Sequence, residues 1–114
     1  MKIFVQIAAY RDPQLIPTIK DMLEKAKRPK NLRLAIARQF HPDDKFDELT
    51  EYENDSRFRI LNIPHEESQG VCWARNLTQQ LYDGEEYTLQ IDSHMRFNLK
   101  CVFFTIIKIG RAHV

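Results

Sequence analysis

The stretch Tyr87-Thr88-Leu89-Gln90-Ile91-Asp92-Ser93-His94 is the part of this chain that decides which fold we expect. Its apolar residues alternate with polar ones up to Ile91, as in a strand that buries one face. Asp92 and His94 come directly after this strand, and side chains two residues apart in an extended segment point the same way. The stretch therefore predicts a strand that presents a carboxylate and an imidazole at its carboxyl end, where open α/β sheets bind their ligands.

Asp92 and His94 form a candidate metal site. Carboxylate oxygens and imidazole nitrogens are common ligands of divalent ions, so both side chains could reach one ion. Such an ion could clamp a diphosphate and neutralise the charge that develops on it as it leaves. The D-x-H triplet occurs by chance in many chains. It gains weight here because it follows a strand that is itself preceded by a helix opened by Gly70.

Three more segments upstream have the pattern of buried strands, at residues 2–9, 32–39 and 57–63. A helix is expected between the first two, because Asp12-Pro13 resembles an N-cap followed by proline at the first helical position. Apolar residues then recur at helical spacing as far as Ala26. A second helix is expected from Gly70 to about Leu81. The element order βαβ(α)βαβ predicts an α/β fold with a mostly parallel sheet and flanking helices.

The composition indicates one small globular domain and excludes several classes of function. The chain has 114 residues, of which 43% are hydrophobic and 29% are charged, as is usual for a globular domain. A net charge of +1 gives no broad attraction for nucleic acid or for an anionic membrane. No run approaches the ~20 apolar residues of a membrane span. Cys72 and Cys101 are unpatterned, which favours a reducing, cytoplasmic compartment.

An acidic stretch runs from Asp43 to Asp55. Within it an apolar residue recurs at every third position, at Phe46, Leu49 and Tyr52, as in a short surface helix. We interpret the acidic side chains as the solvated face of that helix, because their spacing does not match a calcium-binding EF-hand loop.

The loop after the first strand is expected at the same sheet edge as Asp92. Tyr10 could stack on a nucleobase there, and Arg11 could pair with a phosphate or a base edge. A purely structural role is equally consistent with the sequence. Tyr10 would then cover the edge of the sheet, and Arg11 would pair with Asp12.

The helix opened by Gly70 could attract an anion, because a helix N-terminus has free N–H groups and a favourable dipole. Arg75, about a turn and a half into this helix, could reach a phosphate or a sugar hydroxyl there. It could equally be an exposed arginine with a solvent partner. We interpret Trp73 as a packing residue. Cys72 has no C-x-x-C partner, so we interpret it as a buried, inert thiol.

The histidines lack the spacing of a zinc site, because the chain has neither H-E-x-x-H nor C-x-x-C. A zinc-binding or redox domain that uses Cys72, Cys101 and histidines remains a third hypothesis. The sequence also lacks a P-loop, G-x-S-x-G and G-x-G-x-x-G. These absences argue against NTPases, serine hydrolases and dinucleotide-binding enzymes.

Three motifs, taken in order, resemble one enzyme family. They are Ile-Ala-Ala-Tyr-Arg-Asp-Pro at residues 7–13, Gly-Val-Cys-Trp-Ala-Arg-Asn at 70–76, and Leu-Gln-Ile-Asp-Ser-His-Met-Arg-Phe at 89–97. Over residues 3–97 the chain resembles the hydroxyproline-directed N-acetylglucosaminyltransferases. The best-known members of this glycosyltransferase family modify a cytosolic ubiquitin-ligase subunit, and relatives occur in bacteria.

The resemblance implies a Rossmann-like GT-A fold, of which this chain would be the nucleotide-sugar-binding half. It implies that Asp92 and His94 bind Mn²⁺ or Mg²⁺ as a D-x-D-like motif, with Asp92 also near the ribose of the donor. Tyr10 and Arg11 match the loop that faces the uridine, and Arg75 matches an arginine near the diphosphate or the donor sugar. The implied donor is UDP-GlcNAc, the implied acceptor is a protein or glycan hydroxyl, and the metal would stabilise UDP as leaving group.

The pattern of the chain breaks after Phe97. The last six residues, Ile109 to Val114, are what the DNA string ATCGGAAGAGCACACGTC encodes, and that string looks like a sequencing-library adapter. We therefore expect residues 1–97 to be the N-terminal part of a GT-A domain and residues 98–114 to be a non-native tail, the alternative being a genuine strand at 102–107. Since the family continues into an acceptor-binding half, we expect this chain alone to be inactive. A non-catalytic nucleotide or nucleotide-sugar-binding domain is the alternative function.

Overall fold

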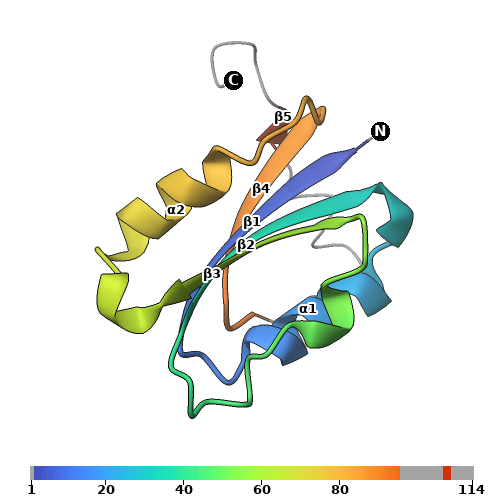
Figure 1. Ribbon diagram of the computed structural model, residues 1–114. Coiled ribbons are helices and arrows are strands. Elements are labelled where there is room, and N and C mark those ends of the chain that lie inside the picture. Colours follow the sequence, from blue (N-terminus) through green and yellow to red (C-terminus); the bar gives the residue numbers. More distant parts are fainter. Residues whose placement is uncertain (1, 96–106, 109–114) are drawn as a thin grey trace.

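The computed structural model describes residues 2–95 and 107–108, which form one five-stranded sheet in the order β3-β2-β1-β4-β5 (Figure 1). The strands are β1 (Ile3–Tyr10), β2 (Leu32–Phe40), β3 (Phe58–Pro64), β4 (Tyr87–Asp92) and β5 (Ile107–Lys108). The first four pair in parallel, whereas β5 pairs antiparallel with the start of β4. The predicted α/β fold with a mostly parallel sheet is confirmed.

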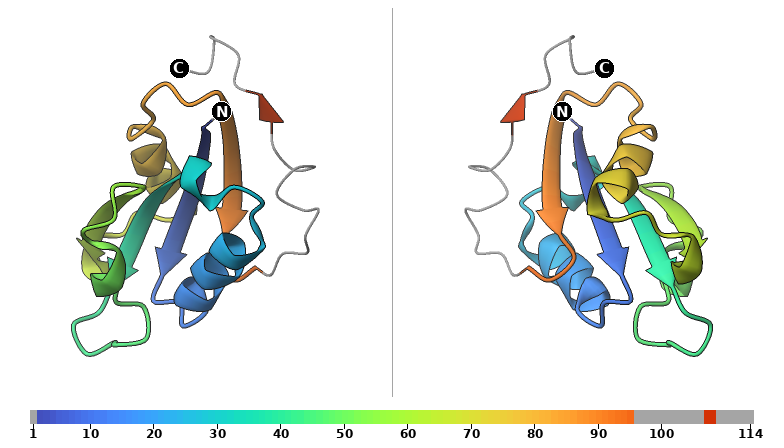
Figure 2. Two further views of the ribbon diagram at one scale, coloured as in Figure 1. Left: turned by 90° about the vertical axis from the view of Figure 1, so that its right-hand side faces the viewer. Right: turned by 90° about the vertical axis from the view of Figure 1, so that its left-hand side faces the viewer.

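The helices α1 (Leu15–Lys25) and α2 (Val71–Gln79) lie on opposite faces of the sheet (Figure 1, Figure 2). Three short 3₁₀ helices complete the described elements: η1 (Pro29–Asn31), η2 (Thr50–Tyr52) and η3 (His65–Glu67). Because helices cover both faces, β1 is buried on both sides. This explains why its sequence is a nearly continuous apolar run rather than an alternating one.

The main core lies between α1 and the sheet. Leu15, Ile19 and Met22 of α1 are fully buried there, in one cluster with Val5 and Ile7 of β1. Each fully buried side chain of this kind stabilises the fold by about 1.5–3 kcal/mol. The apolar stripe of α1 is therefore what holds the helix against the sheet.

Gln6 is a buried polar residue that joins three elements on the opposite face of β1. Its Nε2 donates to Oγ1 of Thr88 on β4 at 3.1 Å, and its Oε1 accepts from Oγ1 of Thr78 on α2 at 3.1 Å. On the same face, the rings of Phe4 and Tyr82 pack edge to face with centroids 5.5 Å apart. Buried polar groups are tolerated when they are hydrogen-bonded, so Gln6 links β1, β4 and α2.

The start of α1 differs from the prediction. Asp12 does not cap a helix that begins at Pro13, because residues 12–14 form a turn in which Asp12 Oδ1 accepts from the Gln14 N–H at 2.8 Å. The helix begins at Leu15. Pro17 then lies in the first turn, where its missing N–H costs the helix no hydrogen bond.

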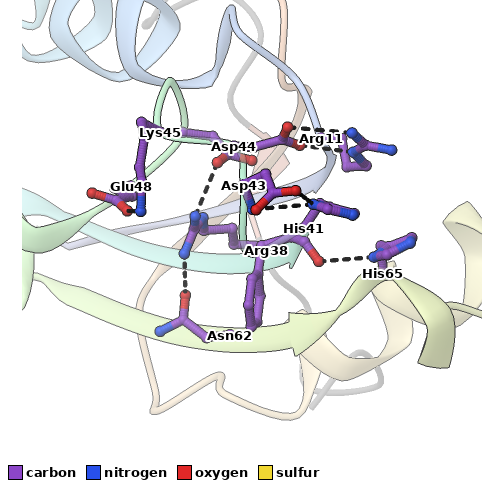
Figure 3. Close-up of polar contacts among 11 residues, drawn as sticks. Arg11, Arg38, His41, Asp43, Asp44, Lys45, Glu48, Asn62 and His65 are labelled. Atoms are coloured by element: carbon purple, nitrogen blue, oxygen red, sulfur yellow. Dashed lines mark hydrogen bonds and ion pairs between the residues drawn. The ribbon is translucent and has the colours of Figure 1, made fainter.

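The acidic stretch at residues 43–55 also differs from the prediction of a surface helix. Its regular part is the short η2, and Asp47 is fully buried instead of solvated. The physical reason is Arg38 of β2, whose Nη2 donates to Asp47 Oδ1 at 3.0 Å. Its Nη1 donates to Asn62 at 3.2 Å, as Figure 3 shows. The guanidinium of Arg38 in β2 is thus the charged partner that allows Asp47 to be buried.

The C-terminal segment 98–114 is described at Ile107–Lys108, where β5 pairs with β4. The predicted boundary at Phe97 and the rest of the expected tail lie outside the described residues. No helix within residues 2–95 and 107–108 is long and apolar enough to cross a membrane. The cytoplasmic location stays a prediction.

Candidate functional site

The candidate site lies where the carboxyl ends of β1 and β4 meet. These strands are neighbours in the sheet, and Ala8 of β1 is in register with Asp92 of β4. The chain leaves β1 through α1 to β2 on one side, while β4 flanks β1 on the other. This is the topological switch point of the sheet, the position at which open α/β folds bind ligands.

Arg75 and Asp92, two of the predicted donor-site residues, are brought together. Nη2 of Arg75 on α2 lies 3.4 Å from Oδ1 of Asp92, and the two side chains are 37% and 56% exposed. An exposed pair of this kind contributes about 0–1 kcal/mol. Arg75 can therefore exchange Asp92 for an anionic ligand at little cost to the fold.

His94 is held by Asp12, a residue that the sequence suggests only as a helix cap or as a partner of Arg11. Asp12 Oδ2 lies 3.3 Å from His94 Nδ1 and accepts a hydrogen bond from Ser93 Oγ at 2.5 Å. Burial raises the pKa of Asp12, but the hydrogen bonds from Ser93, the Gln14 N–H and His94 outweigh it, so the pKa lies below the ordinary 3.8. Asp12 is thus an ionised hydrogen-bond acceptor at neutral pH. Its place in the loop directly after β1 was the indication from which a role in the site could have been predicted.

Arg11 pairs with neither Asp12 nor a residue of β4. Its Nε and Nη2 donate to the two carboxylate oxygens of Asp44 at 2.7 and 3.2 Å (Figure 3). This hydrogen bonding lowers the pKa of Asp44 below its ordinary value. The Arg11 backbone has φ 46°, a conformation that is costly for a residue with a side chain, and its N–H donates to the Gln39 carbonyl at 2.9 Å. The interpretation that Arg11 pairs with Asp12 is wrong.

Tyr10 lies beside two histidines that sequence reasoning did not assign to the site. Its side chain is 53% exposed, and its ring lies edge-on to that of His65 with centroids 6.5 Å apart. The ring of His41 lies 4.9 Å from that of His65, whose Nδ1 is 3.2 Å from the Phe40 carbonyl (Figure 3). Tyr10 ends β1, and His41 and His65 directly follow β2 and β3, the next strands of the sheet, which is the indication that could have grouped them. They present flat rings on which a nucleobase could stack.

Cys72 is exposed, so the interpretation of a buried thiol is wrong. On α2 the buried positions are Ala74 and Thr78, and Cys72 lies on a different side of the helix. Trp73 is half-buried and stands outside the main core cluster. Within residues 2–95 and 107–108, no three His, Cys, Asp or Glu side chains are grouped closely enough to hold a metal ion.

Comparison with known proteins identifies relatives of this arrangement. A family model described as Glycosyltransferase (GlcNAc) matches residues 2–53 and 44–101. No curated protein matches the chain by sequence.

Among solved structures, TarS 1-349 of S. aureus in complex with UDP-GlcNAc has a TM-score of 0.69 and 20% identity, covering 90% of this chain and 29% of TarS 1-349. A second crystal structure of TarS 1-349 gives a TM-score of 0.67 at 20% identity, with 90% and 30% covered. The apo form of GlyE from Streptococcus pneumoniae TIGR4 gives 0.53 at 17% identity, with 96% and 28% covered. The likeness confirms the predicted GT-A type of fold. The chain spans about 30% of the length of TarS 1-349.

Proposed function

This chain belongs to the glycosyltransferase (GlcNAc) family, and we propose on that basis that it forms the donor-binding part of an enzyme that transfers GlcNAc from UDP-GlcNAc to a hydroxyl group. The observation that carries the proposal is the pairing of Asp92 with Arg75 and of His94 with Asp12 at the shared edge of β1 and β4. These pairs bring a cation, two carboxylates and an imidazole to the switch point of the sheet. That set of groups suits a diphosphate and a divalent ion.

The donor would be recognised by three of the predicted residues. Arg75 would leave its exposed pair with Asp92 and donate to the diphosphate, since charge-assisted bonds to phosphate oxygens are among the strongest hydrogen bonds. The exposed ring of Tyr10, beside His65, would stack on the uracil. Arg11 would act through its backbone carbonyl, because Asp44 engages its guanidinium and the Gln39 carbonyl accepts its N–H. The crystal structure of TarS 1-349 in complex with UDP-GlcNAc supports this choice of donor.

The chemistry of two side chains at this edge, a carboxylate and an imidazole, supports a site for Mn²⁺ or Mg²⁺. Asp92 offers an exposed carboxylate, and His94 makes its contact with Asp12 through Nδ1, which leaves Nε2 for a metal. Divalent ions of this class are commonly bound by one or two protein groups together with substrate phosphates and water, so two ligands from this chain are sufficient. When bound, the ion would neutralise charge on UDP as it leaves.

The acceptor belongs to the finer part of the proposal. The motifs at residues 7–13, 70–76 and 89–97 favour the hydroxyl of a hydroxyproline in a protein. Fused to the acceptor-binding part of a family member, the chain should transfer label from radiolabelled UDP-GlcNAc to a hydroxyproline peptide, whereas the same peptide with proline should stay unlabelled. Equal labelling of both peptides would refute this specificity. Donor binding without any transfer by this fused enzyme would support the alternative of a non-catalytic nucleotide-sugar-binding domain.

Calorimetric titration of the chain with UDP-GlcNAc, with and without Mn²⁺, tests the donor site. We expect binding that requires Mn²⁺ and that is lost in Asp92→Asn. Asp83→Asn is the matched control, because Asp83 is exposed in the loop before β4, and it should bind as the unchanged chain does. Binding that persists in Asp92→Asn would refute the metal assignment. A folded chain that binds no UDP-GlcNAc would refute the donor site itself.

A further inference from the structure

Asp12 collects hydrogen bonds from parts of the chain that are far apart in sequence. Oδ1 accepts from the Gln14 N–H at 2.8 Å, and Oδ2 accepts from Ser93 Oγ at 2.5 Å and contacts His94 Nδ1 at 3.3 Å. The side chain of Asp12 is 17% exposed, whereas that of His94 is 66% exposed. A half-buried carboxylate with both oxygens engaged thus holds an exposed imidazole.

The backbone on both sides of His94 is fixed as well. Thr18 of α1 is fully buried, and its Oγ1 donates to the Ser93 carbonyl at 3.0 Å and accepts from the Met95 N–H at 2.9 Å. Residues 93 and 95 are therefore anchored to α1, while Asp12 holds the ring of the residue between them. The position of His94 is set by the first turn of α1 and the loop before it.

The contact with Asp12 decides which nitrogen of His94 carries the proton. A carboxylate whose oxygens accept hydrogen bonds can partner Nδ1 when that nitrogen is the donor. The neutral ring is then the Nδ1–H tautomer, and the lone pair is on Nε2. Metal-binding histidines are generally held in this way, through a hydrogen bond from the second ring nitrogen to a carboxylate or carbonyl.

We propose that Asp12 is a positioning residue of the donor site, which keeps His94 in the Nδ1–H tautomer and so makes Nε2 the ligand for the divalent ion. The inference rests on the proposed function, since the metal role of His94 comes from there. Asp12 itself is a hydrogen-bond acceptor in this arrangement and not a metal ligand, because both of its oxygens already have donors. Its contribution is made through His94.

The tautomer can be observed directly without metal or donor. In ¹⁵N NMR spectra of the chain at a pH where imidazoles are neutral, the ring nitrogens of His94 should show the Nδ1–H pattern, with assignment by the His94→Gln variant. Asp12→Asn should shift His94 toward the Nε2–H tautomer that histidine prefers in water. Asp44→Asn is the matched control: it removes a carboxylate that pairs with Arg11, and it should leave His94 unchanged.

Binding of Mn²⁺ and UDP-GlcNAc provides the second readout. Asp12→Asn should weaken Mn²⁺-dependent binding about 10- to 100-fold, as is usual when such an outer partner is lost, and Asp44→Asn should preserve the Mn²⁺ dependence. If Asp12→Asn does not fold, the spectrum of the unchanged chain still decides, because an Nε2–H pattern at His94 would overturn the proposal.

An Asp12→Asn variant with an unchanged tautomer and unchanged donor binding would overturn this inference alone. The expected tautomer in a folded chain that binds no UDP-GlcNAc would overturn the proposed function, and with it the metal role of Nε2. The two failures are therefore distinguishable.

Discussion

Replacing Asp47 by leucine should destabilise the fold by about 3–5 kcal/mol, the usual cost of leaving one member of a buried ion pair without the other. Asp47 is fully buried, and its Oδ1 lies 3.0 Å from Nη2 of Arg38, whose side chain is 10% exposed. In Asp47→Leu the guanidinium keeps Asn62 at 3.2 Å and the ring of Phe40, 5.0 Å from Cζ. Neither carries a negative charge.

The double variant Arg38→Met, Asp47→Leu should recover most of this loss. The pair is imperfectly satisfied, because Arg38 Nε and Asp47 Oδ2 are buried without a hydrogen-bond partner within the described part of the chain. Apolar side chains of similar volume often replace such a pair at no cost.

Urea unfolding, followed by circular dichroism, gives the free energy of unfolding for each variant. A domain of this size is stable by on the order of 5–15 kcal/mol, so the loss in Asp47→Leu is readily measured. Asp43→Leu is the control, because the Asp43 side chain is 91% exposed, and it should change stability by less than about 0.5 kcal/mol. Equal losses in the single and double variants would refute the reasoning.

Three further predictions concern the proposed donor site and the fold. Arg75→Ala should weaken UDP-GlcNAc binding about tenfold or more, since a charged hydrogen bond is lost. The urea midpoint should barely move, because the ion pair of Arg75 with Asp92 is exposed. Undiminished binding in calorimetry would contradict this prediction. Burial raises the pKa of Glu85, but the ion pair with Arg59 at 3.0 Å and further hydrogen bonds lower it below the ordinary 4.5. The stability that ionised Glu85 contributes is therefore present above about pH 4.5 and is lost as the pH falls through the pKa of Glu85 in the folded chain. Glu85→Gln should show a shallower acid-induced fall in the urea midpoint. An unchanged slope would count against the ion pair of Glu85 with Arg59. Gly70→Ala should lower the free energy of unfolding by about 1–3 kcal/mol through backbone strain alone, because φ is 100° and no atom lies within 4 Å of an added Cβ. A melting temperature equal to that of the unchanged chain would show that the strain is relieved.

The strands and the edge of the sheet where the site lies were predictable because their determinants are local. β1 and β4 have apolar patterns that can be recognised within eight and six residues. Parallel strands align their carboxyl ends, so the placement of Tyr10 and Asp92 at the same edge of the sheet follows from the element order.

The contacts that complete the site were not predictable, because their partners are distant in sequence. Arg11 is 33 residues from Asp44, and Asp12 is 82 residues from His94. Nothing in the local sequence distinguishes the observed pairing of Arg11 with Asp44 from a pairing with the adjacent Asp12. Nor does it distinguish the contact of Asp12 with His94 from a role of Asp12 as a helix cap. Asp47 is a similar case, because the acidic pattern around it is that of a solvated surface. Its burial depends on Arg38, which lies nine residues earlier in β2.

The position of β1 between β2 and β4 has a consequence for folding during synthesis on the ribosome. At about 5–20 residues per second, the segment that carries His94 is synthesised roughly 4–16 s after Asp12, which lies 82 residues earlier. During that interval one edge of β1 has no β4 to pair with, and exposed edges of apolar strands invite association with other chains. The nascent chain is therefore most vulnerable to aggregation just before β4 emerges, and the candidate site is completed in the same step that closes this edge.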